Sequence, residues 1–351
     1  MSSAALRDGV LAVPVIDISS FRMPYADASA RSQVVRRVDA AARTVGFMQI
    51  IGHGISAITT REFTNAMDAF FGLDGPAKAK YRCPPGINRG YTPPTAESLA
   101  NSLGLVAAGD LFEAINVGTS AADFPGLDLP EDVYAPNVYP SDEVPGFEAA
   151  VTAWFEAAGR VARTMVRILG TALGGSEDHF QRFTDHSIDV LRMNNYRLPG
   201  PDAELEPDQL GMGAHTDYGI VTVLWADQVP GLEIHGADGN WHPVRPADGA
   251  LLVNLGDATA RWTNEEWIST LHRVAPPRSG GAGVPRRSAA YFHDGNVDAV
   301  IECLPSCVTE DNPARYEPVT VGQHLAAKLA GSRGGQLNPH ATREVARLRT
   351  A

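Results

Sequence analysis

The sequence predicts an α+β fold with a mainly β core, a double-stranded β-helix (jelly roll) supported by helices in the N-terminal half. The first observation is a long helical stretch, Phe147–Leu173, in which apolar residues recur every three or four positions until Gly174 ends it. The second is that beyond residue 188 short β-rich runs alternate with turn residues, which is typical of a sandwich or barrel. These runs are Val190–Leu198, Val221–Ala226, Leu232–His235, Trp241–Val244, Leu251–Leu255, Ala289–His293 and Ala299–Leu304.

Helices and edge strands are expected before that core. Val13–Ile18 and Gly46–Gly54 are predicted strands, and the second ends in a glycine-rich turn. Arg31–Thr44 and Thr60–Phe71 have the apolar spacing of helices. The segment Pro84–Pro94 holds four prolines and two glycines, so it is expected to be a loop.

Composition and charge narrow the class of function. Of 351 residues, 44% are hydrophobic and 20% are charged, which is enough apolar surface for a sizeable core. The formal charge of -12 argues against a nucleic-acid partner, because such proteins need clustered positive charge. Three cysteines are too sparse for a disulfide scaffold, and no apolar run approaches the ~20 residues that span a bilayer. Since Met1–Val15 lacks the pattern of a signal peptide, we expect a cytoplasmic protein without a membrane partner; the oligomeric state stays open.

One tripeptide, His215-Thr216-Asp217, carries the chemistry of a metal site. On an extended strand its two flanking side chains share a face, so an imidazole and a carboxylate can bind one ion from adjacent corners. His272 is the best candidate for a third ligand. Two histidines and one carboxylate leave three positions of the metal open, which is the geometry of non-haem iron(II) oxygenases. The tripeptide alone is weak evidence, because ten histidines make a chance match common.

An Arg-x-Ser pattern downstream strengthens the hypothesis. Arg286 and Ser288 alternate onto one face of a predicted strand, while Arg287 points away. A guanidinium beside a hydroxyl suits a small carboxylate, which the planar fork of arginine binds through two hydrogen bonds. The alternative is an arginine that pairs with a surface acid.

In this order the motifs resemble the isopenicillin N synthase-like iron(II)- and 2-oxoglutarate-dependent oxygenases, over about residues 13 to 330. No single motif is specific, but the ordered set is. The matching segments are Val13–Asp17, Gly46–Gly54, Leu191–Tyr196, Gly213–Asp217, Val229–Glu233, Gly249–Asp257, Trp262–Asn264, Ser269–Val274, Arg286–Ser288 and Tyr316–Gly322.

The resemblance implies a role for each matching polar residue. The resemblance implies that iron(II) is bound by His215, Asp217 and His272. It implies that the distal carboxylate of 2-oxoglutarate is contacted by Arg286 and Ser288, with Asn194 and Tyr196 as further contacts. The implied reaction couples oxidative decarboxylation of 2-oxoglutarate by O2 to hydroxylation, desaturation or cyclisation of a small-molecule, secondary-metabolite substrate. The chain departs from the family at Asn195, where an aromatic residue is commoner, and at residues 256–261, which are small and polar.

The resemblance also implies a division of the chain and a substrate pocket. Residues 1–145 correspond to the N-terminal non-haem dioxygenase region, 146–186 to a backing helix, 187–300 to the jelly-roll core, and 301–351 to a C-terminal segment with a candidate lid. The candidate pocket walls are Tyr91, Phe112, Leu224 and Phe292, each of which could equally be ordinary packing.

Three alternatives stay open at this point. The first is a 2-oxoglutarate-independent iron(II) oxidase of the isopenicillin N synthase type, in which the Arg-x-Ser pair meets another anion. The second is a zinc hydrolase that uses the same three ligands to activate water. The third is an inactive binding scaffold. The other histidines are expected to be structural (His53, His235, His242 and His293) or to lie on the surface (His179, His186, His324 and His340).

Overall fold

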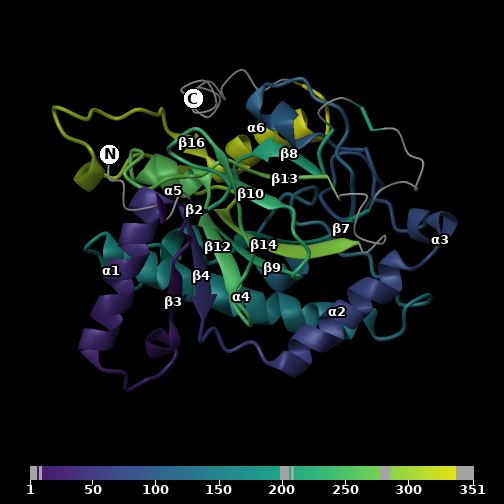
Figure 1. The fold of residues 1–351 in the computed structure, drawn as a ribbon, viewed down its shortest axis with the longest axis horizontal. Helices are drawn as coiled ribbons and strands as arrows, with labels where there is room; N and C mark the ends of the chain where they lie inside the picture. The colour runs from purple at the N-terminus through teal and green to yellow at the C-terminus, as the bar shows by residue number, and fades with distance from the viewer. Residues whose placement is uncertain (1–5, 8–9, 198–204, 207–208, 277–284, 337–351) are drawn as a thin grey trace.

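Two β-sheets form the centre of the molecule (Figure 1), in a computed structural model that describes residues 6–7, 10–197, 205–206, 209–276 and 285–336. The larger sheet has eight strands, in the spatial order β3 (Val15–Asp17), β4 (Phe47–Ile51), β12 (Leu251–Leu255), β9 (Val221–Ala226), β14 (Arg286–Asn296), β7 (Ser187–Tyr196), β6 (Phe112–Gly118) and β5 (Gly90–Thr92). The smaller sheet has four, in the order β11 (Trp241–Pro243), β10 (Leu232–His235), β13 (His272–Val274) and β8 (Met212–His215). The predicted mainly β core is confirmed.

Helices cover the larger sheet on the side away from the smaller one (Figure 1). They are α1 (Ala28–Thr44), α2 (Ala57–Phe71) and α4 (Phe147–Ala172). The short α3 (Gly75–Ala79) lies at the right-hand edge of the view, and α5 (Asp257–Trp262) and α6 (Val321–Ser332) lie nearer the smaller sheet. The apolar stripe of α4 packs against α1, α2 and the strands β9 and β14. Trp154 of α4 stacks on Phe63 of α2 with ring centroids 4.6 Å apart, and both are buried. Two short pairs complete the described strands: β1 (Leu6–Arg7) with β2 (Val10–Leu11), and β15 (Val300–Ile301) with β16 (Val319–Thr320).

Strand β14 lies at the centre of the larger sheet, between β9 and β7, and its register sets the site. Arg286 pairs with Tyr196 and Ser288 with Asn194, both on β7. Because side chains alternate along a strand, Arg286 and Ser288 share a face with those partners, and Arg287 points to the other face, where it pairs with Asp68 of α2. The predicted alternation of these three residues is confirmed.

The structure corrects several sequence expectations. The segment predicted to be loop contains the edge strand β5, because Gly90, Tyr91 and Thr92 pair with β6. The run predicted as a strand over Ala299–Leu304 is reduced to the two residues of β15. Position 198 of the predicted run Val190–Leu198, His340 and most of the candidate lid lie outside the described residues.

None of the helices in the described part of the chain is both long enough and apolar enough to cross a membrane. The three cysteines, Cys83, Cys303 and Cys307, are free thiols.

Candidate metal centre and the cavity around it

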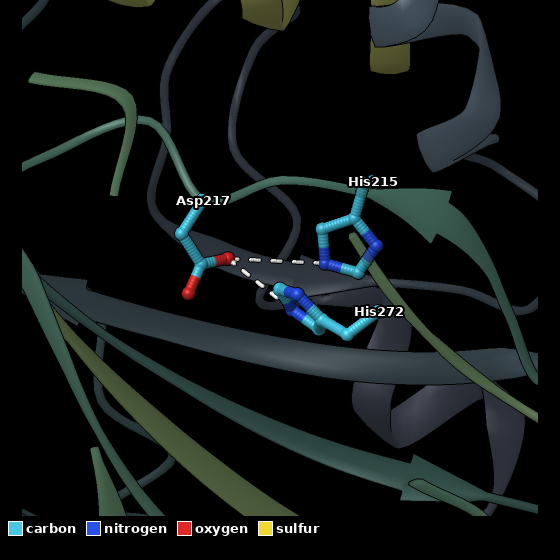
Figure 2. Close-up of side chains that lie close together, drawn as sticks. All are labelled: His215, Asp217 and His272. Carbon is cyan, nitrogen blue, oxygen red and sulfur yellow. Dashed lines mark ion pairs between the residues drawn. The ribbon is translucent and has the colours of Figure 1, made fainter. Parts of the chain in front are cut away.

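Two imidazoles and one carboxylate converge between the two sheets. His215 ends β8, His272 begins β13, and these two residues pair across the smaller sheet. Asp217 Oδ1 lies 3.8 Å from His215 Nε2 and 3.6 Å from His272 Nε2 (Figure 2). All three side chains are buried, and their candidate ligand atoms lie within 4.8 Å of one another. The expected common strand for the His-x-Asp tripeptide is wrong in detail, because β8 stops at His215 and Asp217 belongs to the connection that follows.

Backbone carbonyls orient both imidazoles. His215 Nδ1 lies 2.7 Å from the carbonyl oxygen of Gly213, and His272 Nδ1 lies 3.0 Å from that of Thr270. A carbonyl oxygen only accepts, so each Nδ1 carries the proton and each Nε2 keeps its lone pair directed at Asp217. Burial, followed by the nearby His272 ring, lowers the pKa of His215 to about 3. The imidazole therefore stays neutral at physiological pH, which is the form that binds a metal.

The carboxylate of Asp217 is oriented by two donors from the larger sheet. Thr222 Oγ1 donates to Asp217 Oδ2 at 2.5 Å, and Asn254 Nδ2 donates to the same oxygen at 2.6 Å. Oδ1 is left to face the two histidines (Figure 2). Hydrogen bonds of this kind hold a ligand in place before the metal arrives. Neither Thr222 nor Asn254 was singled out from the sequence, although Asn254 lies in one of the matching motifs.

A buried ionic cluster supports the connection that carries Asp217. Asp257 of α5 accepts hydrogen bonds from Thr216 Oγ1 at 3.1 Å and from Ser269 Oγ at 2.7 Å. Lys328 Nζ, from α6, lies 2.8 Å from the same carboxylate, and His324 Nε2 lies 3.7 Å from it. The sequence expectation that His324 lies on the surface is therefore wrong: α6 turns it inward, against Asp257. The cluster connects the C-terminal helix to the residue between two candidate metal ligands.

Arg286 is poised to bind an anion. Its side chain is 3% exposed, and its Nε and Nη1 atoms are buried without a hydrogen-bond partner. Its guanidinium lies over the ring of Tyr196, 4.9 Å from the centroid. Ser288 and Asn194 lie one row further along the same face. A buried guanidinium with unsatisfied N–H groups is costly unless a ligand satisfies them, so this end of the site fits a small carboxylate.

A cavity of about 740 Å³ joins the candidate metal centre to Arg286. The three candidate metal ligands line it, and so do Arg286, Ser288, Asn194 and Tyr196. Of the proposed pocket walls, Tyr91, Leu224 and Phe292 line the cavity. Phe112 is not among the lining residues; it is buried between the Tyr196 ring and the Arg192 guanidinium. The Tyr91 hydroxyl donates to Glu113, so this residue also has a structural role.

A polar cluster on the cavity wall, the Glu97 cluster, is formed by Glu97, Arg192 and Arg333, and the sequence reasoning missed it. Arg192 Nε also donates to Asn194 Oδ1 at 3.1 Å, so the cluster adjoins the Arg286 end. Arg192 Nη2 donates to Glu97 Oε2 at 2.8 Å, and Arg333 Nε lies 3.0 Å from Glu97 Oε1. Burial by itself raises the pKa of Glu97, but the guanidinium groups of Arg192 and Arg333 outweigh it, so the pKa lies below its ordinary value. All three residues line the cavity, and Arg333 brings the end of α6 to it. No local motif could have revealed a cluster whose members come from three distant segments.

Two family descriptions match the chain. The family described as "non-haem dioxygenase in morphine synthesis N-terminal" matches residues 13–142. The family described as "2OG-Fe(II) oxygenase superfamily" matches residues 188–295, which include the candidate metal ligands and Arg286.

Individual relatives are similar over most of their length. A 2-oxoglutarate-Fe(II) type oxidoreductase of Aspergillus fumigatus is 33% identical over 325 residues, which cover 91% of this chain and 93% of the relative. The validamycin A dioxygenase of Streptomyces hygroscopicus subsp. limoneus is 29% identical, with 90% of this chain and 85% of the relative covered. The crystal structure of a full-length Neurospora crassa protein in complex with alpha-KG and thymine has a TM-score of 0.79 at 26% identity, with 94% of this chain and 99% of that chain covered.

Proposed function

Because the chain belongs to the 2-oxoglutarate- and iron(II)-dependent oxygenases, we propose that His215, Asp217 and His272 are its iron ligands. The protein is an oxidoreductase that uses iron(II), 2-oxoglutarate and O2 to oxidise a small molecule. The observation that carries the assignment is the convergence of three ligand atoms within 4.8 Å, while the remaining polar atoms of the same side chains are held by the protein. Neutral imidazoles and an ionised carboxylate are the donor set that iron(II) takes in this class.

Iron(II) and 2-oxoglutarate, when bound, supply the oxidative decarboxylation that activates O2 for attack on a substrate C–H bond. The residues of the chain bind and orient the reactants, and they exclude water. Gly213 and Thr270 set the tautomers of the two histidines, while Thr222 and Asn254 set the direction of Asp217. The burial of all three ligands keeps bulk water from the reacting centre.

The distal carboxylate of 2-oxoglutarate is assigned to Arg286 and Ser288, with Asn194 and Tyr196 beside it. The unpartnered Nε and Nη1 of Arg286 support the assignment, since an ionised carboxylate is a strong acceptor for a buried guanidinium that still has free N–H groups. Ser288 lies two residues along β14 and lines the same cavity. Tyr196 packs under the guanidinium and limits its movement.

The oxidised substrate is a small molecule, proposed to be a secondary metabolite, and the outcome is hydroxylation, desaturation or cyclisation. The name of the validamycin A dioxygenase supports this substrate class. We retain the proposed division into 1–145, 146–186, 187–300 and 301–351. A cytoplasmic location without a nucleic-acid partner is also proposed, on the free thiols and the charge of -12.

Anaerobic addition of iron(II) and 2-oxoglutarate to the purified protein tests the ligand assignment. The visible metal-to-ligand charge-transfer band should form with the wild-type protein and be lost in Asp217→Ala, and aerobic turnover should release succinate. A band of normal intensity in Asp217→Ala would overturn the assignment. Turnover without succinate would point to an oxidase that does not use 2-oxoglutarate.

Two neighbouring arginines test the co-substrate assignment. Arg286→Ala should weaken 2-oxoglutarate binding by about 2–5 kcal/mol, because it removes one partner of a buried charge pair. Arg287→Ala is the matched control: it removes the same charge one residue away, from a side chain that points to the other face and pairs with Asp68. Equal affinities in the two variants would move the anion site elsewhere.

A further inference from the structure

Asp294 is a buried carboxyl group on the cavity wall that the reaction chemistry does not use. Its side chain lies on β14, on the same face as Arg286 and Ser288 but beyond Phe292. Phe292 pairs with Thr222, the residue that bonds Asp217. A Cβ atom on Gly219 would collide with the Asp294 carboxyl group, so that group lies against the turn that follows Asp217. Asp294 is thus on the opposite side of the candidate metal centre from Arg286.

Asp294 has no partner among the described residues. It is 7% exposed, and none of the described side chains or backbone groups makes a hydrogen bond or an ion pair with it. Among the other buried Asp, Glu, Lys and Arg side chains in the described part of the chain, all except Arg286 have such a partner. Glu97 with Arg192, Lys78 with Glu113 and Lys328 with Asp257 are examples.

Burying an ionisable group without a partner is unfavourable, so both exceptions indicate groups that are completed by a ligand. For Arg286 that ligand is an anion, the co-substrate. By the same argument Asp294 requires a cation or a strong hydrogen-bond donor. The charged groups that act on Asp294 are themselves acidic: Asp189, which is paired with His293, and Asp217. The field at this end of the cavity therefore favours positive charge.

A metal ion does not fit the Asp294 position. In the described part of the chain, His215, Asp217 and His272 form the single group of metal-ligating side chains that converges closely enough to hold an ion. Asp294 offers one carboxyl group in a cavity that is also lined by apolar residues such as Ile188 and Leu325. A carboxylate forms strong, charge-assisted hydrogen bonds with ammonium and guanidinium groups, and a single charged group in a mostly apolar pocket fixes the orientation of a small molecule.

We propose that Asp294 binds a basic nitrogen group of the substrate, a protonated amine or a guanidinium, and so orients the substrate at the metal. This inference rests on the proposed function, because it takes His215, Asp217 and His272 as the iron site. The substrate would then lie between Asp294 and the iron ligands, with the co-substrate on the side of Arg286. Burial raises the pKa of Asp294 well above its usual range, with added contributions from Asp189 and Asp217, and a bound cation would restore the ionised form.

Matched fragments test the proposal on the whole protein loaded with iron(II) and 2-oxoglutarate under anaerobic conditions. The probes are benzylamine, benzyl alcohol and phenylacetate, and their binding is followed by the change in the charge-transfer band and by ligand-observed NMR. Wild-type protein should bind benzylamine at least tenfold more tightly than benzyl alcohol, and phenylacetate weakest. In Asp294→Asn this preference should be lost, so that benzylamine and benzyl alcohol bind with about equal affinity.

Two controls separate the possible results. Glu302→Gln removes an exposed acid a few residues further along the chain and should keep the wild-type preference. Asp294→Asn should keep its charge-transfer band and match or exceed the wild-type Tm, because it replaces an unpartnered buried carboxyl group by a neutral one. A strongly lowered Tm would assign Asp294 a structural role and overturn the proposal, as would an equal amine preference in wild type and Asp294→Asn. Absence of the band in the wild-type protein would instead overturn the proposed function.

Discussion

Two parts of the cavity wall are built in different ways. At the end near Arg286, the important residues come from the adjacent strands β7 and β14, and the register of those strands brings Arg286, Ser288, Asn194 and Tyr196 onto one face. In the Glu97 cluster, Glu97 comes from a loop, Arg192 from β7 and Arg333 from the end of α6. The first part is a pattern within a sheet, and the second is an assembly of distant segments.

The difference matches the tasks of the two parts. Relatives named as 2-oxoglutarate-Fe(II) oxidoreductases share one co-substrate, so a rigid set of residues on neighbouring strands is sufficient for it. Substrates differ between the relatives, and loops and terminal helices can vary without disturbing the sheet. Perturbing the Glu97 cluster should therefore change stability and substrate selection, while the charge-transfer band with 2-oxoglutarate should still form.

The largest effect is expected from Glu97→Gln. This change leaves the buried Arg192 and the half-buried Arg333 without a carboxylate, so the free energy of unfolding should fall by about 3–5 kcal/mol, as measured by urea denaturation at pH 7. The matched control is Glu156→Gln, which removes one member of an exposed pair with Arg160 and should change stability by less than about 0.5 kcal/mol. Similar effects of the two substitutions would mean that Glu97 does not hold this cluster together.

Asn254→Ala should have a smaller effect, confined to the metal. Without the Asn254 amide, Asp217 Oδ2 keeps Thr222 as its other donor, and the carboxylate is held less firmly toward the histidines. Iron(II) affinity should fall by about 10- to 100-fold, measured by anaerobic titration, with little change in Tm. Replacing the exposed Asn65 of α2 by alanine should leave the affinity unchanged. An unaltered iron affinity in Asn254→Ala would show that Thr222 alone orients Asp217.

The smallest effect concerns pH. The lowered pKa of Glu97 means that its contribution to stability is present above the ordinary glutamate pKa of about 4.3 and is lost as the pH falls through the folded-state value. The difference in unfolding free energy between wild type and Glu97→Gln should therefore be largest near pH 7 and shrink below about pH 4. A difference that stays constant over this range would indicate that Glu97 acts through packing and not through its charge.

Much of the co-substrate end could be predicted from the sequence because its signals are local. The alternation of Arg286, Arg287 and Ser288 follows from the pleat of a strand, and His215 with Asp217 follows from a three-residue spacing. The prediction that Asp217 lies on the same strand as His215 was wrong for a local reason. A strand ends where its backbone pairing ends, and the side-chain pattern does not indicate that position. The role of Asn254 could have been suspected from its motif, but its donation to Asp217 depends on two strands meeting.

The Glu97 cluster and the position of His324 could not be predicted, because burial and pairing are consequences of long-range packing. The neighbours of His324 are mostly small or apolar, and whether α6 turns this side chain toward Asp257 or toward solvent depends on how the helix packs. Glu97 and Arg192 are 95 positions apart, and neither stands out in its own segment.

By itself the sequence determined the mainly β core, the long backing helix and the set of side chains able to hold iron(II) and a small carboxylate. These features could be predicted because hydrophobic periodicity and the chemistry of donor side chains depend on residues that are close together in the sequence. Only the tertiary structure decided which charged groups face inward and which of them lack a partner. Arg286 and Asp294 differ from the other buried charged residues solely in what the folded chain leaves beside them. That difference arises when distant strands and helices pack together, and it is the physical basis for assigning ligands to both.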